Sequence, residues 1–244
     1  MGLCLVTKLK ESVADSSLSK IGEKTLVLAP QKSFTIRGKG IELRGLTGNF
    51  DITLIGGNTY EGLNHYVDVS ANYFSCRNTS SNPLTIGVNN LEVLEVFSAD
   101  GGANALEIDL NFFEKSKGMS ELNLSRQIIT GGELSDLSEI TNNSTLTGLE
   151  FTRCIGLKGS IEDIASLRMI DSAFPSFLAC PEVTGSVEEF VRGQRANGRT
   201  NANLANGYWI TQSGITFNGK TYADLVSISW TASTITVNGE TINA

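Results

Sequence analysis

The stretch Gly159-Ser160-Ile161-Glu162-Asp163-Ile164 recurs, with conservative changes, as Gly185-Ser186-Val187-Glu188-Glu189-Phe190. A looser copy, Gly132-Glu133-Leu134-Ser135-Asp136-Leu137, precedes them, so the opening glycines lie 27 and 26 residues apart. A nearly constant interval of this size indicates a supersecondary unit stacked on itself, because one unit of that length cannot bury its own apolar face. The sequence therefore predicts a repeat architecture.

Short segments with a two-residue alternation accompany these copies, which predicts strands with one apolar face. They are Leu91-Glu92-Val93, Leu106-Glu107-Ile108, Leu122-Asn123-Leu124 and Leu149-Glu150-Phe151. A glycine follows ten residues after the first leucine in three of the four, at Gly101, Gly132 and Gly159. Each unit thus combines a strand, a turn glycine and a short Leu-x-x-Leu-like segment. This order predicts an irregular leucine-rich-repeat-like solenoid over residues 91–200, in which each coil adds one strand to a parallel sheet. The asparagine ladder of standard leucine-rich repeats is missing and the intervals vary, so an accidental β-rich pattern is the alternative.

β-rich regions flank these repeats. In residues 21–90, short apolar runs separated by glycines and polar breaks predict strands at 26–28, 34–36, 41–43, 52–55, 66–69 and 84–88. A short helix is expected over 190–199, closed by Gly198. Residues 201–244 carry two Asn-Gly pairs between alternating residues and predict a C-terminal β-hairpin cap. The predicted fold class is mainly β, an irregular leucine-rich-repeat-like solenoid flanked by β-rich regions, with residues 1–20 as an N-terminal attachment segment.

The charge of the chain argues against a nucleic-acid partner, and its apolar pattern argues against a membrane. A net charge of -7 and a pI near 4.9 supply no basic field for phosphates, so we expect no nucleic-acid partner. The amino terminus lacks the basic start and apolar stretch of a secretory signal, and no apolar run is long enough to span a membrane. We therefore expect no membrane association and folding in a cytoplasm.

The cysteines and the single histidine predict neither a metal nor a cofactor. Cys4, Cys76, Cys154 and Cys180 include no C-x-x-C pair, and His65 is distant in sequence from all but Cys76. We expect free, mostly buried thiols, because cysteine behaves as a small hydrophobe. Cys154 and Cys180 lie about one repeat apart and are expected to stack on adjacent coils without bonding.

No catalytic constellation emerges, and we expect a protein that is not an enzyme. His65 has no nucleophile elbow beside it and suits a turn or strand edge. The paired acids at 162–163 and 188–189 resemble the two carboxylates of a glycosidase. They recur at equivalent places in successive repeats, however, whereas a catalytic pair occurs once. Solvated charge at a helix start is the preferred interpretation.

The aromatic residues of the C-terminal part allow two interpretations. Trp209 and Trp230, with Tyr208 and Tyr222, could form a platform for a sugar or a protein partner. Both tryptophans fall in predicted strands, so packing in a core or an interface is favoured.

Two phrases of the sequence resemble a known family. These are Gly185 to Thr200, which contains the last repeat copy, and the opening Leu3 to Lys10. Both are similar to leucine-rich-repeat-like proteins of gut Bacteroidetes and of the crAss-like bacteriophages that infect them. The resemblance covers the first ten or so residues and roughly residues 131–230. It implies a virion component, in particular a head fibre or a decoration on the capsid, and it carries over no catalytic residue.

The preferred hypothesis is therefore a bacteriophage virion structural protein, a head-fibre or capsid-decoration subunit that acts by protein–protein assembly. Its partners would be copies of itself, because open sheet edges favour a symmetric homo-oligomer, and other capsid or fibre proteins. Leu3, Leu5, Val6 and Leu9 are the predicted docking strand, with a first core strand of the same subunit as the alternative. The alternative function is a module that binds a bacterial surface glycan or protein through Tyr208 and Trp209. A glycan-cleaving enzyme is the least supported hypothesis.

Overall fold

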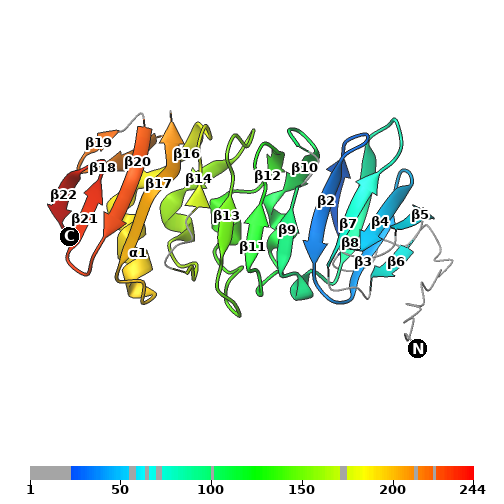
Figure 1. The fold of residues 1–244 in the computed structure, drawn as a ribbon, viewed down its shortest axis with the longest axis horizontal. Helices are drawn as coiled ribbons and strands as arrows, with labels where there is room; N and C mark the ends of the chain where they lie inside the picture. Colours follow the sequence, from blue (N-terminus) through cyan, green and yellow to red (C-terminus); the bar gives the residue numbers. More distant parts are fainter. Residues whose placement is uncertain are drawn as a thin grey trace.

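The computed structural model describes residues 23–54, 59–63, 66–69, 73–99, 102–170, 175–211, 214–221 and 224–244. These residues are mainly β and form several sheets along an elongated body (Figure 1). The predicted attachment segment, including Leu3, Leu5, Val6 and Leu9, lies outside the described residues.

The N-terminal part consists of antiparallel strands in two sheets. They are β1 (Lys24–Leu28), β2 (Ser33–Arg37), β3 (Ile41–Gly45), β4 (Phe50–Leu54), β5 (Thr59–Leu63), β6 (Tyr66–Val69), β7 (Tyr73–Asn78) and β8 (Leu84–Asn89). One sheet contains β1, β8, β3 and β6, and the other contains β2, β7, β4 and β5. The alternating leucines Leu26 and Leu28 of β1 are buried, as period-two patterning requires. The strands predicted from the apolar runs are confirmed for the described residues.

The repeat region pairs its strands in parallel. On one side of the body lie β9 (Val96–Ser98), β11 (Glu121–Asn123), β13 (Gly148–Glu150) and β15 (Pro175–Ser176), and each pairs in parallel with the next. On another side lie β10 (Leu106–Asp109), β12 (Ile128–Gly131), β14 (Lys158–Ser160) and β16 (Glu182–Ser186). β10 pairs with β12 and β14 with β16, and an isolated parallel bridge joins Ile128 of β12 to Ile155, three residues before β14. The parallel pairing places one repeat directly beside the next.

The repeated segment itself begins a short helix in each copy. These helices are η2 (Leu110–Phe113), η3 (Leu134–Leu137), η4 (Ile161–Ile164) and α1 (Val187–Ala196), the first three being 3-10 helices. Successive helices contact each other along the body. The apolar positions of the Leu-x-x-Leu-like segment, such as Ile161 and Ile164, are fully buried. The helix predicted near residue 190 is confirmed as α1.

Two details of the predicted repeat are wrong. The sequence predicted one strand per repeat, whereas each repeat supplies two. Of the second strands only β10 carries the apolar-x-apolar alternation that marked the predicted strands, and β12, β14 and β16 lack it. The predicted strand at Leu91–Val93 is a 3-10 helix, η1, since Asn90 turns the chain with φ 60° and the Leu94 N–H donates to the Leu91 carbonyl. Phe97, not Leu91, pairs in register with Leu122.

Both sides of the body continue across residue 90 without a break. β2 pairs with β9, so that Ile36 lies opposite Phe97. β1 pairs with β10, so that Leu26 lies opposite Ile108. The buried residues of the N-terminal strands and of the repeats form one continuous apolar core. The predicted β-rich and repeat regions therefore share both sheets and the core.

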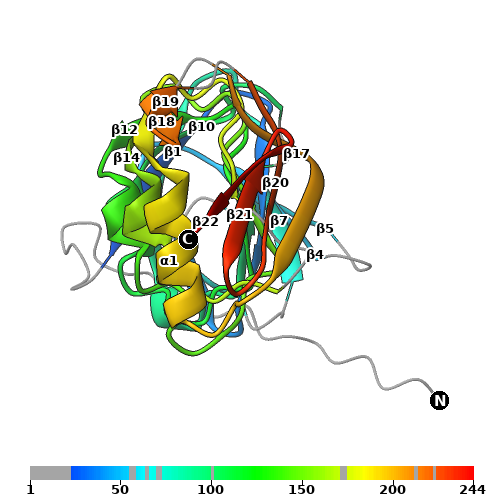
Figure 2. The ribbon, with the colours of Figure 1, turned by 90° about the vertical axis from the view of Figure 1, so that its left-hand side faces the viewer.

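The C-terminal part closes one end of the body. Its strands are β17 (Ala202–Thr211), β18 (Gly214–Phe217), β19 (Lys220–Thr221), β20 (Asp224–Trp230), β21 (Thr234–Val237) and β22 (Glu240–Asn243). Both Asn-Gly pairs adopt positive φ, 49° and 70° at 218–219 and 49° and 85° at 238–239, as a type I′ hairpin requires. The hairpin β18–β19 extends the side of β14 and β16, while β17, β20, β21 and β22 form a four-stranded sheet. Figure 2 shows this sheet and α1 covering the end of the body. The two predicted hairpins are confirmed.

Candidate functional site

The glycine that opens each repeat copy is required by the stacking. Gly159 and Gly185 have φ of 115° and 124°, which L side chains rarely adopt. A Cβ on Gly159 would lie 2.8 Å from the Leu134 backbone nitrogen, in the preceding copy. A Cβ on Gly185 would lie 2.2 Å from a Glu162 carboxylate oxygen, again in the preceding copy. The glycine therefore allows one copy to approach the next.

The acids of the repeat are hydrogen-bonded to backbone groups. Asp163 accepts from the Ser160 N–H at the start of η4, at 3.0 Å, a capping box that Asp136 repeats in η3. Glu162 accepts from the Ser186 N–H at 2.6 Å, and Glu188 accepts from the Asn218 N–H at 2.6 Å.

The interpretation of Glu162 and Glu188 as merely solvated charges is therefore wrong. Both are half-buried, and each ties its own helix to the strand that stacks next along the body. Sequence alone cannot show this, because the partner N–H groups lie 24 and 30 residues away. These contacts give the recurring acids a structural role in the stacking.

The cysteines of adjacent repeats occupy equivalent places. Cys154 donates its thiol to the Leu124 carbonyl and Cys180 donates to the Phe151 carbonyl, both at 2.8 Å. Both are buried and free, as is Cys76, so the predicted buried thiols are confirmed for the described cysteines. The hydrogen bond with Cys180 and burial raise the pKa of Cys154, and burial raises the pKa of Cys76. The neutral, enclosed thiols of Cys76 and Cys154 are therefore poor nucleophiles.

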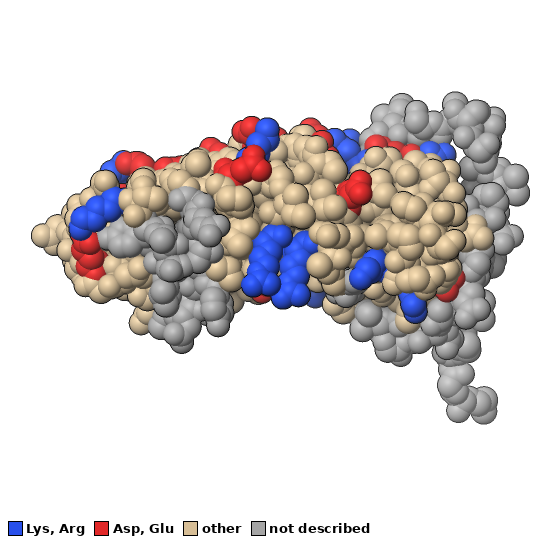
Figure 3. Space-filling model, turned by 90° about the horizontal axis from the view of Figure 1, so that it is seen from above, with Lys and Arg blue, Asp and Glu red and all other residues tan. Residues whose placement is uncertain are grey.

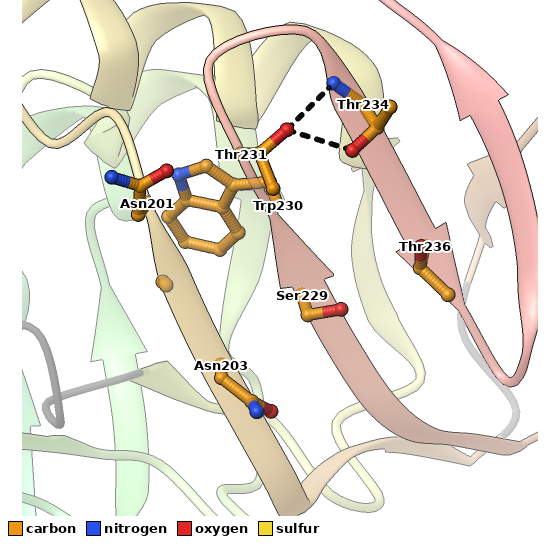
Figure 4. A pocket seen from close by; sticks show the side chains of 8 residues that line it. Asn201, Asn203, Ser229, Trp230, Thr231, Thr234 and Thr236 are labelled. Carbon is orange, nitrogen blue, oxygen red and sulfur yellow. Dashed lines mark hydrogen bonds between the residues drawn. The ribbon is translucent and has the colours of Figure 1, made fainter.

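A shallow groove of about 440 Å³ lies on the outer face of the C-terminal sheet. Asn203, Ser229 and Thr236 stand side by side across β17, β20 and β21 in cross-strand register (Figure 4). Further along the groove the Thr231 hydroxyl is hydrogen-bonded to Thr234. The remaining lining residues are Asn201, Ala202 and Trp230, so no lining side chain is charged.

The polar groups of this groove differ in their availability. The Asn203 amide and the Ser229 hydroxyl make no hydrogen bond within the described chain, whereas the Thr236 hydroxyl is 2.8 Å from that of Thr241. A row of uncharged amide and hydroxyl groups in a concavity of this size suits a neutral, hydroxyl-rich ligand. The alternation Ser-Ile-Ser-Trp and Thr-Ile-Thr-Val is the sequence signal that could have revealed the row.

Trp230 supports the groove from below and is not an exposed platform. Its side chain is 2% exposed, its indole N–H donates to the Arg199 carbonyl at 3.1 Å, and the Arg199 guanidinium lies 5.0 Å from the ring centroid. Arg199 also donates to Gln194 of α1, which in turn donates to two carbonyls after η4. Core packing, the favoured interpretation for the tryptophans, is confirmed for Trp230.

The structure places Tyr208 and Trp209 in an irregular part of β17. The register against β20 shifts between Ala205 and Ile210. The chain advances five residues along β17 there but only two along β20. An irregularity of this kind interrupts the ladder and bends the strand. Tyr208 and Trp209 therefore share β17 with the groove residue Asn203, while Tyr222 and His65 lie outside the described residues.

Within the described ranges, no group of three or more His, Cys, Asp or Glu residues is arranged to hold a metal ion. The described helices include none that is long and apolar enough to cross a membrane. Comparison of the chain with protein-family models, with curated proteins and with solved structures finds no match.

Proposed function

We propose that this chain is a structural subunit of a bacteriophage virion, of the head-fibre or capsid-decoration type, and that it acts by protein–protein assembly. Its body would be an irregular leucine-rich-repeat-like solenoid flanked by β-rich regions. The parallel register of β9, β11, β13 and β15 supports one coil per repeat. Equivalent turn residues Arg126, Arg153 and Ala179 share φ values of 65°, 58° and 56°, which supports the same assignment.

The observation that carries the assembly role is the difference between the two ends of the elongated body. The C-terminal end is covered by α1 and the four-stranded sheet (Figure 2). At the other end β5 and β6 are the outermost strands of their sheets in the described chain. Edge strands carry unpaired backbone groups that accept a further strand. A subunit that docks by the end with β5 and β6 and projects its closed end fits a fibre or a decoration. The docking strand that we propose from the sequence is Leu3, Leu5, Val6 and Leu9, within residues 1–20.

Mass spectrometry of purified phage particles tests this function. We expect the chain in the particle at a stoichiometric level, and its absence from the particle would contradict the proposal. Incorporation of a Leu3→Asp/Leu5→Asp variant should be lost if these residues dock, whereas Ser233→Asp, at an exposed position of the C-terminal end, should be incorporated normally. Light scattering of the purified protein should report a homo-oligomer, and a strict monomer at high concentration would weigh against self-assembly.

A second candidate function, a glycan-binding module, is favoured by the groove on the C-terminal sheet. Asn203 and Ser229, which make no side-chain hydrogen bond within the described residues, offer amide and hydroxyl groups to a neutral oligosaccharide, and the groove lies at the C-terminal end of the body. On an array of neutral glycans, Asn203→Ala and Ser229→Ala should each weaken binding at least tenfold, while Ser233→Ala outside the groove should not change it. Trp209→Ala tests the contribution of the bulge in the same assay. A blank array would count against this function.

A further inference from the structure

One turn of each repeat places a residue in the left-handed region of backbone conformation. Arg126 and Arg153 occupy this position in successive repeats, with φ of 65° and 58°. Asn104 has φ 54° in the preceding turn, and asparagine is the residue that tolerates this conformation best after glycine. Arginine has no such preference, so its presence at two stacked turns is not explained by the backbone.

The two arginines lie directly beside each other. The Arg126 N–H donates to the Thr152 carbonyl, and the Arg153 N–H donates to the Leu178 carbonyl, so each turn is hydrogen-bonded to the next. Adjacent strands are about 4.8 Å apart, and like charges at that spacing repel each other. Both side chains are exposed, and neither makes an ion pair or a side-chain hydrogen bond within the described chain.

Several other cations of the described residues are paired with acids. Lys117 pairs with Glu139, and Lys158 pairs with Glu133. Arg126 and Arg153, in contrast, present two adjacent unneutralised charges in a protein whose net charge is -7.

A third cation continues the row. The Lys32 ammonium lies 3.9 Å from the position that a Cβ on Gly102 would take, and the Gly102 carbonyl accepts from Gln127, the residue after Arg126. Lys32, like the arginines, has no ion-pair partner in the described chain. Figure 3 shows this side of the molecule, with basic side chains next to one another over its middle and others toward the N-terminal half. We call Lys32, Arg126 and Arg153 the basic edge.

We propose that the basic edge binds an acidic polysaccharide, a chain of sugar rings that carry carboxylate groups. The edge runs across the strands, so successive cations are offered in a line along the body. A polyuronic acid carries a carboxylate on every sugar ring, so several of its charges can reach a line of cations. Guanidinium groups bind carboxylates through paired hydrogen bonds, which makes arginine the suitable residue.

Two other polyanions fit less well. Nucleic acid depends on many phosphate contacts in a basic field, whereas this chain is acidic overall and the edge has three cations. An extended acidic peptide turns successive side chains to opposite faces, so only every second carboxylate would face the edge.

The test is a binding measurement on the purified full-length protein, and it depends neither on particle incorporation nor on the neutral groove. The probes are a hexamer of galacturonic acid and its uncharged methyl ester, titrated calorimetrically at several salt concentrations. We expect the acid to bind at least tenfold more tightly than the ester. The double variant Arg126→Asn/Arg153→Asn should lose at least tenfold of that affinity and show a weaker salt dependence.

The same substitutions separate binding from folding. Asparagine tolerates positive φ better than arginine, so the double variant should have a melting temperature at or above that of the parent protein. Arg192→Gln removes an exposed arginine of α1 that is paired with Glu189, and it should leave binding unchanged. Equal affinity for the ester, undiminished binding by the double variant, or tighter binding of a single-stranded oligonucleotide or a poly-glutamate peptide would each overturn the proposal.

Discussion

Replacement of Gly159 with alanine is expected to lower the free energy of unfolding by about 4 kcal/mol. A residue with a Cβ held at φ 115° is strained by about 1–3 kcal/mol. The new Cβ also meets the Leu134 backbone nitrogen at 2.8 Å and the Leu134 Cβ at 3.1 Å, and forced overpacking costs roughly 1–3 kcal/mol more. The backbone of the preceding copy cannot move aside without disturbing η3. Urea denaturation followed by circular dichroism measures the loss.

Two other glycines separate the sources of this loss. Gly198, after α1, has φ 89° but open space around a Cβ, so Gly198→Ala should cost only about 1 kcal/mol through strain. Gly148 has no positive φ, and its Cβ would make an ordinary 3.5 Å contact with Glu121, so Gly148→Ala should be neutral or slightly stabilising. If Gly198→Ala were as harmful as Gly159→Ala, strain alone would explain the effect and the close approach between copies would be unimportant.

Short sequence signals were sufficient to predict the turns, the start and end of the helix, and the length of the repeat. Asn218-Gly219 and Asn238-Gly239 specify their turns through their own φ angles, and both hairpins form. Ser186 with Glu189 begins α1, and Gly198 follows its end. The spacing of the opening glycines gave the repeat unit. Each of these features depends on residues within a few positions of one another.

The arrangement of the repeats depended on contacts that a sequence does not display. Leu91 has the same alternation as Leu122, yet Asn90 diverts it into a 3-10 helix and Phe97 takes its place in the sheet. Alternation predicts a strand, but it does not say which sheet the strand joins. The predicted leucine-rich-repeat-like organisation stays a proposal, while the mainly β class is confirmed.

The candidate binding surfaces were missed for a similar reason. Asn203, Ser229 and Thr236 come from three strands, and only cross-strand register brings them into one row. Arg126 and Arg153 are 27 residues apart and become neighbours through the parallel stacking. The recurring acids of the repeat were noticed in the sequence but were predicted to be solvated. Their backbone hydrogen-bond partners lie 24 and 30 residues further along the chain, so the sequence does not show them.

We expect Phe97 to couple the stability of the N-terminal sheets to that of the repeats more strongly than any other described residue. It is fully buried and lies against three aromatic rings, stacked on Phe34 with centroids 5.4 Å apart and edge-on to Phe112 and Phe113 at 5.6 and 5.3 Å. Phe34 belongs to the N-terminal strands, while Phe112 and Phe113 belong to η2. Phe97→Ala should therefore cost about 4 kcal/mol, from lost burial, the cavity and the aromatic contacts.

The loss at Phe97 should be transmitted to the far end of the body. Trp209 and Trp230 both lie on the C-terminal four-stranded sheet, so tryptophan fluorescence reports on that end, whereas circular dichroism reports on all strands. Because one core and paired sheets run from β1 into the repeats, we expect Phe97→Ala to shift both signals to the same lower urea midpoint. Phe97→Leu keeps most of the volume and should give a smaller, equally coincident shift. A fluorescence midpoint that stays in place while the circular dichroism midpoint falls would mean that the repeats unfold independently of the N-terminal strands, as nearest-neighbour coupling in long repeat arrays permits.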